Sequence, residues 1–127
     1  MIDVLLYLAA LLLVALGVGH SYLGERYVLA PLFRLNDLPR LAGSAFYMQR
    51  ILRVAFHVTS IAWWGLAAIL VMLAHPPLEA RGVSLAIAVT ALVSFAVVLI
   101  GTRGKHRLAW VTFLIIGVVA LYYSVRR

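Results

Sequence analysis

Four stretches of the chain are almost uninterrupted runs of apolar residues, and polar segments separate them. A helix of about 20 apolar residues crosses the ~30 Å hydrocarbon layer of a membrane. We therefore predict membrane-spanning helices at about residues 4–24, 53–74, 83–101 and 107–124. The connections after the second and third stretches are short, so these neighbours must run antiparallel. The expected fold class is all-α, a single domain (1–127) built as a four-transmembrane-helix antiparallel bundle.

A secretory signal peptide is the alternative explanation for the first apolar stretch. The chain begins with Met1, Ile2 and Asp3, so no Lys or Arg precedes the apolar run. No small-residue cleavage site follows it either. We therefore interpret residues 4–24 as the first membrane-spanning helix.

The longest connection, residues 25–49, mixes large apolar side chains with charged ones. This mixture is typical of an amphipathic segment that lies in the membrane interface. Pro31 and Pro39 remove backbone donors, so we expect a broken helix here. A disordered tether is disfavoured, because its many apolar residues would face water.

The second apolar stretch carries a polar stripe. At about 100° per residue in a helix, its polar and aromatic members lie within about 60° of one another. They are Arg50, Arg53, His57 and Trp64, with Ser60 at the edge. A polar stripe on a segment otherwise suited to lipid must face protein, water or a ligand. We therefore expect the functional site at this stripe.

Composition excludes an ordinary soluble domain. Hydrophobic residues make up 65% of the 127 positions and charged residues 12%, which is about half the usual charged share. The chain has no cysteine, which excludes thiol chemistry and thiolate metal sites. The net charge of +7 would suggest nucleic acid for a soluble protein, but here the cations flank apolar stretches. We expect the partners to be the lipid bilayer and its anionic headgroups, and no nucleic acid.

The positions of the cations predict an orientation. Eight Lys and Arg residues lie within residues 22–53 and 101–107, whereas Arg81, Arg126 and Arg127 flank the opposite ends. The positive-inside rule places the side with eight cations in the cytoplasm and both termini outside. We predict a multi-pass protein of the bacterial inner membrane. The expected headgroup contacts are Arg34, Arg40, Arg103, Lys105 and Arg107.

Two histidines are candidate ligands near the predicted cytoplasmic boundary. Neutral imidazole binds haem iron, copper and zinc, and a carboxylate can complete a metal site. We predict that His20 and His57 bind a haem, or together with Glu25 a transition metal, between the first two spans. Gly17 and Gly24 would leave room for such a group. The plainer interpretation is that backbone carbonyls or headgroups satisfy both imidazoles.

The rest of the stripe fits the same hypothesis. Arg53 or Arg50 would neutralise acidic groups of a cofactor, and Trp64 would be its flat wall. The simpler alternative is that both arginines only orient the helix. Trp64 would then only pack beside the notch at Gly65.

A resemblance to known families rests on part of this stretch. His57 is followed seven residues later by Trp64 and then Gly65, in an apolar helix preceded by Arg53. This pattern resembles a helix of the copper-resistance D-type membrane proteins. It is also similar to a pattern in small four-helix haem-linked oxidases of bacterial porphyrin synthesis. The resemblance covers about twenty of the 127 residues and implies copper or haem at His57. Residues 19–27 resemble segments of small bacterial membrane proteins and imply no activity.

Several functions of four-span proteins lack the residues they need. All acids lie at or outside the predicted span boundaries, which argues against a proton-coupled exporter; they are Asp3, Glu25, Asp37 and Glu79. No Ser, His and acid trio converges as a hydrolase requires. The sequence therefore favours a small binding protein over an enzyme. Two alternatives stay open. One is an accessory or lipid-binding subunit of a homo-oligomer or larger membrane complex, and the other is a small oligomeric transporter or channel.

Overall fold

The structure, a computed structural model, describes residues 1–41 and 43–126. Its secondary structure is helical throughout, so the all-α class is confirmed. The elements are α1 (Ile2–Leu23), the π-helix η1 (Gly24–Leu29), α2 (Ala30–Leu32), α3 (Ala45–Leu73), α4 (Ala80–Gly101) and α5 (Arg107–Arg126).

Four helical stretches are long and apolar enough to cross a membrane. They are Ile2–Leu32, Ala45–Leu73, Ala80–Gly101 and Arg107–Arg126, and each contains one of the apolar runs of the sequence. These four candidate spans are the expected features of a multi-pass membrane protein.

The connection after the first helix is shorter than the predicted 25–49. The helix does not end at residue 24 but continues through η1 and α2 to Leu32. In η1 the hydrogen bonds reach one residue further than in an α-helix, as when Ala30 N–H donates to the Glu25 carbonyl. Pro31 follows directly, within the first turn of α2, where its missing N–H is tolerated. We expected Pro31 to break the helix, but the helical stretch continues past Pro31 to Leu32.

The second long helix also begins earlier than residue 53. Ser44 is its N-cap, and its Oγ accepts a hydrogen bond of 3.2 Å from the Tyr47 N–H. This cap starts α3 at Ala45, so residues 45–49 belong to a helix rather than to the connection. At the other end α3 stops at Leu73, shortly before Pro76 and Pro77, which cannot continue a helix.

The turn between α4 and α5 is tight. Arg103 and Gly104 both have positive φ angles, 52° and 72°. The Gly104 N–H donates to the Leu99 carbonyl over 2.8 Å, a typical way to end a helix. The turn thus returns the chain directly alongside α4.

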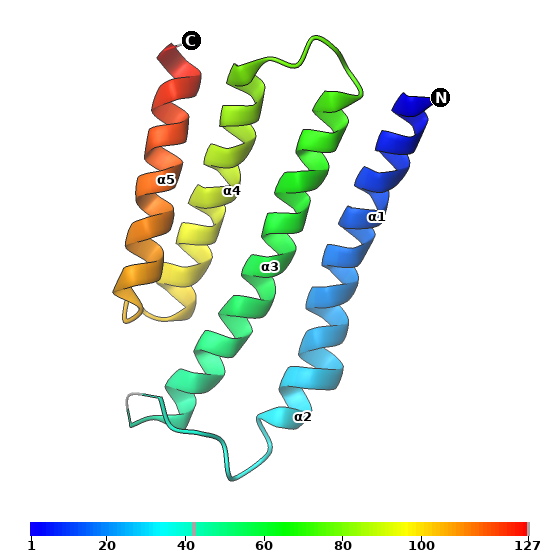
Figure 1. Cartoon of the computed structure of the whole chain (residues 1–127). Helices are drawn as coiled ribbons and strands as arrows, with labels where there is room; N and C mark the ends of the chain where they lie inside the picture. The colour runs from blue at the N-terminus through cyan, green and yellow to red at the C-terminus, as the bar shows by residue number, and fades with distance from the viewer. Residues whose placement is uncertain (42, 127) are drawn as a thin grey trace.

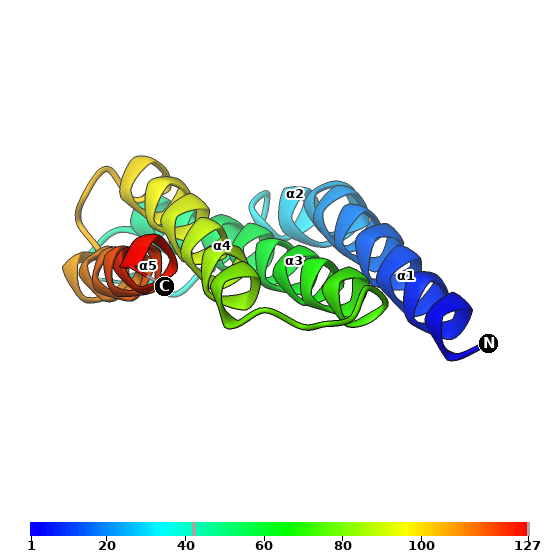
Figure 2. The ribbon, with the colours of Figure 1, turned by 90° about the horizontal axis from the view of Figure 1, so that it is seen from above.

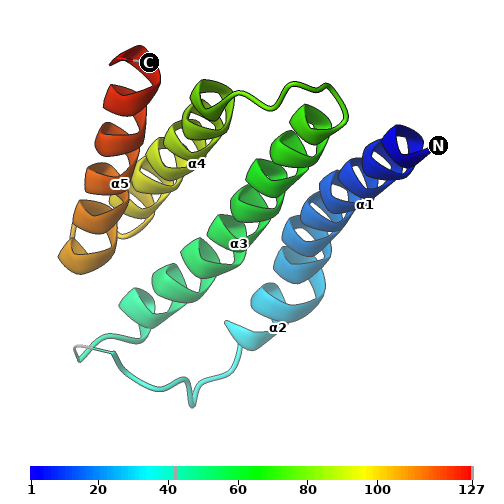
Figure 3. The same ribbon diagram turned by 45° about the horizontal axis from the view of Figure 1, so that its top comes forward.

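The four long helices lie in a row. α3 contacts α1 and α4, and α4 in turn contacts α5, whereas in the described part of the chain α1 touches neither α4 nor α5. Figure 1 shows successive helices running in alternate directions, and Figure 2 shows the row from above. In Figure 3 the connection between α2 and α3 lies at the lower end. A closed bundle would surround one shared core. These residues form an open row instead, so the predicted bundle packing is not seen.

Small residues fill the helix interfaces. The buried residues include Ala10, Gly17, Ser60, Ala67, Ala88, Ala91, Ser94 and Gly117. Many large apolar side chains point outward instead, such as Leu12 and Ile100, which are 71% and 74% exposed. Close backbone approach with outward-facing Leu and Ile is how helices pack in lipid, where burial of large apolar groups gives no advantage.

Candidate functional site

A cluster of polar side chains joins the first helix to α3. It consists of Ser21 on α1, Glu25 on η1, and Arg53, His57 and Ser60 on α3, and we call it the head cluster. Arg53 and Glu25 form a bidentate ion pair, with Nη2 to Oε1 at 2.6 Å and Nε to Oε2 at 3.0 Å. Such forked pairs are stronger and more directional than single contacts.

His57 is held by two neighbours within the head cluster. Its Nδ1 lies 3.0 Å from Ser21 Oγ, and its Nε2 lies 3.8 Å from Glu25 Oε2. The Ser21 hydroxyl also hydrogen-bonds Ser60 Oγ over 2.8 Å, so the three side chains form one connected network.

The π-helix brings Glu25 to this position. Gly24 opens η1 against the ring of Phe56, and a Cβ at Gly24 would lie 2.6 Å from two ring carbons. The missing side chain therefore allows η1 to approach α3 closely. π-turns are rare and occur frequently at functional sites. Their presence here supports a functional interpretation of the head cluster.

An apolar groove between α3 and α4 begins at the head cluster. Its first part, of about 620 Å³, starts at Arg53 and His57. Its second part, of about 410 Å³, shares Val89 and Val93 with the first and reaches Met72. We call the two parts together the tail groove. From residue 53 to residue 72 a helix rises about 28 Å, close to the ~30 Å thickness of the hydrocarbon layer.

Trp64 lies in the wall of the tail groove. On the α1 side its ring occupies the space that a Cβ of Gly17 would need, and its Nε1 donates to the Val14 carbonyl over 3.3 Å. The indole is still 40% exposed and lines the groove on the other side. The aromatic ring is thus fixed by α1 and available to a ligand.

His20 lies apart from the head cluster. Its ring stacks on Phe56 with 4.6 Å between centroids and meets Trp63 edge-on at 4.9 Å. It lines a cavity beside Phe56, whereas His57 lines the tail groove. The side chains of Trp64 and Phe56 fill the notches at Gly17 and Gly24, where we expected room for a cofactor.

The structure does not bring the two predicted histidine ligands into one cavity. Two ligands of one metal ion must each lie within about 2.1 Å of it, and His20 and His57 face different cavities. Among residues 1–41 and 43–126, no three His, Asp or Glu side chains gather as a metal site would require. Of the three predicted metal ligands, His20, His57 and Glu25, only Glu25 and His57 lie close to each other.

Arg50 lies outside the head cluster, and its side chain points toward α4. Its Nη1 donates to the Gly101 carbonyl over 2.7 Å, and its guanidinium lies 4.7 Å from the centre of the Phe46 ring. The guanidinium of Arg103 lies 6.0 Å from the same ring. The predicted stripe is thus divided between two places, Arg53 and His57 at one and Arg50 at the other.

The other predicted headgroup residues lie on the connections at the same end of the molecule. Arg34 and Arg40 belong to the connection before α3, Lys105 to the α4–α5 turn, and Arg107 begins α5. None of these four forms an ion pair with a described residue.

Ser21 and Phe46 are site residues that were not predicted from the sequence. Ser21 stands one turn before Glu25, and Phe46 one turn before Arg50, so helical spacing carried a signal for both.

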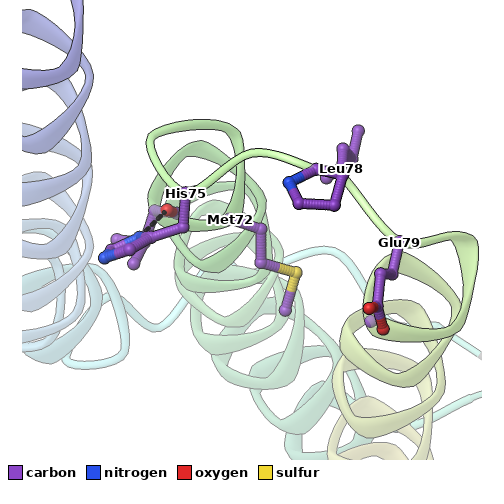
Figure 4. A pocket seen from close by; sticks show the side chains of 7 residues that line it. Met72, His75, Leu78 and Glu79 are labelled. Carbon is purple, nitrogen blue, oxygen red and sulfur yellow. Dashed lines mark hydrogen bonds between the residues drawn. The ribbon is translucent and has the colours of Figure 1, made fainter.

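A second contact joins α1 to α3 at the opposite end. The Tyr7 hydroxyl lies 2.8 Å from His75 Nε2, and His75 Nδ1 lies 3.0 Å from the Val71 carbonyl. Figure 4 shows His75 pointing toward α1, while Met72 and Glu79 border a cavity of about 230 Å³. This contact fixes the upper end of α1 against α3.

Comparisons of the chain with models of protein families, with curated proteins and with solved structures found no match. The copper and haem functions implied by the resemblance at His57 therefore stay predictions.

Proposed function

We propose that this protein is a multi-pass protein of the bacterial inner membrane that binds an amphipathic molecule. The tail of the ligand lies in the tail groove and its head lies at the head cluster. One observation carries the proposal. A charge-balanced polar cluster opens into the end of an apolar groove that is nearly as long as the hydrocarbon layer is thick.

The orientation follows the positive-inside rule, with the head cluster on the cytoplasmic side and both termini outside. The end of the molecule that carries the head cluster holds eight of the eleven Lys and Arg residues. An even number of candidate spans supports the proposal that both termini lie on the same side.

A ligand explains why the head cluster is left partly open. The side chains of Arg53, Glu25 and His57 are 48%, 36% and 35% exposed, beside a groove lined by Val, Leu and Ile. Charged groups that face hydrocarbon are costly unless a polar partner covers them. A polar head placed against the cluster covers these atoms, and a tail fills the groove beside it.

The charges of the cluster favour a neutral head. Glu25 already balances Arg53, so an anionic head would meet a carboxylate as well as a guanidinium. Arg53 keeps Nη1 as a donor, and His57 lines the groove with a ring nitrogen that can form a hydrogen bond. A ring that carries carbonyl or hydroxyl groups satisfies both.

The length of the groove favours one long tail. A phospholipid chain reaches only the middle of the bilayer, about 15 Å, whereas the groove extends for about 28 Å. A prenylated quinone combines a neutral carbonyl or hydroxyl ring with such a tail. We therefore propose this class of ligand.

The test compares two valines that are both exposed on helices. Val89 lines both parts of the tail groove, and Val119 lies on α5 away from it. They are 53% and 62% exposed, so Val89→Phe and Val119→Phe are matched changes. Mass spectrometry of extracts from the purified proteins should find a neutral prenyl lipid in the wild type and in Val119→Phe. In Val89→Phe its amount should fall about tenfold, because overpacking of a groove costs about 1–3 kcal/mol.

The other outcomes separate the alternatives. Equal amounts of bulk phospholipid in all three proteins, with a copurifying protein, would favour the accessory subunit over a quinone-binding protein. An optical spectrum of the same wild-type sample, oxidised and dithionite-reduced, tests the haem prediction. A Soret band that is absent in His57→Ala would replace our proposal with a haem protein.

A further inference from the structure

Two arginines share one aromatic ring at the base of α3 and α4. Phe46 lies in the first turn of α3, Arg50 one turn further on, and Arg103 in the turn before α5. The guanidinium carbons of Arg50 and Arg103 lie 4.7 and 6.0 Å from the ring centre, close enough for cation–π attraction. Both cations thus contact the same aromatic ring.

Both arginines are held by the backbone around them. Arg50 Nη1 donates to the Gly101 carbonyl over 2.7 Å, and α3 approaches α4 closely there because Val54 packs where a Cβ of Gly101 would stand. Arg103 has a left-handed backbone with φ of 52°, fixed by the tight turn. The Arg50 side chain and the Arg103 backbone are therefore ordered in advance, which lowers the cost of binding a ligand.

Neither cation is neutralised. The end of the molecule that carries eight Lys and Arg residues has two acids, Glu25 and Asp37, and Glu25 is engaged by Arg53. Within the described ranges, neither Arg50 nor Arg103 forms an ion pair. Arg50 Nε is in addition buried without a hydrogen-bond partner among these residues. The two guanidinium groups lack an anion, in contrast to the head cluster.

We propose that Arg50 and Arg103 bind the phosphate of an anionic phospholipid, a second site beyond the one of the proposed function. Planar guanidinium groups hydrogen-bond phosphate oxygens through two parallel N–H bonds. Phe46 is 56% exposed and contacts both guanidinium groups, so its ring offers an apolar surface beside the phosphate.

A lipid is a better occupant than free phosphate. The turn is bordered by Ile100, which is 74% exposed, and by the open ring of Phe46. Acyl chains cover these apolar surfaces, whereas a free phosphate leaves them exposed. On the predicted cytoplasmic side, anionic headgroups also attract each added Lys or Arg.

The experiment uses the full chain in nanodiscs of phosphatidylcholine, with phosphatidylglycerol added in steps. Binding of phosphatidylglycerol is followed by native mass spectrometry. The variants are Arg50→Gln and Arg103→Asn, since Asn tolerates the left-handed backbone. The matched control, Arg26→Gln, removes the same charge at the same end of the molecule from η1.

We expect Arg50→Gln and Arg103→Asn each to weaken phosphatidylglycerol binding about fivefold or more, and Arg26→Gln less than twofold. An equal loss in all three variants would mean diffuse attraction to charge and would overturn the site. The absence of any loss would overturn it too. Because Arg103 lies on an exposed turn, its variant decides the matter if Arg50→Gln fails to fold. Displacement of the lipid by millimolar inorganic phosphate would show that free phosphate, not lipid, is bound.

Discussion

The α1–α3 and α4–α5 interfaces join neighbouring helices by different means. α4 and α5 contain no acidic residue, so no Asp or Glu ion pair links them. Ser84 Oγ donates to the Ala120 carbonyl over 2.6 Å, and Gly117 receives Leu92. The α1–α3 contact uses comparable notches at Gly17 and Gly24, and η1 adds the ion pair of Glu25 with Arg53.

This difference between the two interfaces shows that an ion pair is not required to hold neighbouring helices together. The α4–α5 interface achieves close packing with small residues and apolar side chains such as Leu92, without any acidic residue. Charged groups in a membrane-spanning helix are expensive and usually serve a function. The extra polar residues beside α3 are therefore better explained by a ligand than by helix association.

The largest loss of stability should come from adding a side chain at Gly17, where the Trp64 ring packs. In Gly17→Val the new side chain would collide with Trp64, and we expect a loss of about 1–3 kcal/mol of stability. Gly19→Val is the control, because a Cβ at Gly19 meets nothing within 4 Å. Unfolding in detergent with increasing SDS measures both. Equal losses would mean that α1 does not pack on α3 through this notch.

The next effect concerns the ion pair of the head cluster. Glu25→Ala and Arg53→Ala should each destabilise the protein, because each leaves an unpaired charge. The double variant should lose less than the sum, with a coupling energy of about 0.6–1.7 kcal/mol. The same SDS unfolding measures this cycle. A coupling energy near zero would show that the pair is not formed in the membrane.

Substitution of His57 and of His20 should affect the amount of bound ligand differently. His57→Phe removes the hydrogen-bonding imidazole of the head cluster and should lower the retained prenyl lipid by about three- to tenfold, as expected for one hydrogen bond. His20→Phe keeps a ring stacked on Phe56 and should retain the lipid. Mass spectrometry of purified samples quantifies both. An equal decrease in both variants would instead favour the paired-histidine site that the sequence suggested.

The smallest effect should appear on the other side of the row. Ser84→Ala removes one hydrogen bond to the Ala120 carbonyl and leaves the small-residue packing intact. We expect a loss of about 0.6 kcal/mol and no change in bound lipid. A loss as large as that of Gly17→Val would contradict the contrast between the interfaces.

Much of the fold was predictable because apolar length alone identifies the four long helices. The continuation of the first helix past Pro31 was not predictable, because the π-turn before this proline leaves no simple periodicity in the sequence. The open row of helices was not predictable either, because apolar periodicity does not indicate which helices contact each other.

The site was predicted in part, through the stripe of α3. Arg53 and His57 share a site, but Arg50, three residues before Arg53, turns to Gly101. His20 was expected to meet His57, yet Ser21 occupies that position. Such choices depend on how α1 is rotated against α3, and a single sequence does not contain that angle.

The most direct test of the account is binding of a quinone that carries a long alkyl tail. The protein is placed in nanodiscs of phosphatidylcholine, and quenching of tryptophan fluorescence is followed, because Trp64 lines the tail groove. We predict saturable quenching in the wild type and in Val119→Phe, and an affinity about tenfold lower in Val89→Phe. Non-saturating quenching that is the same in all three proteins would show simple partition into lipid and would contradict a ligand in the groove.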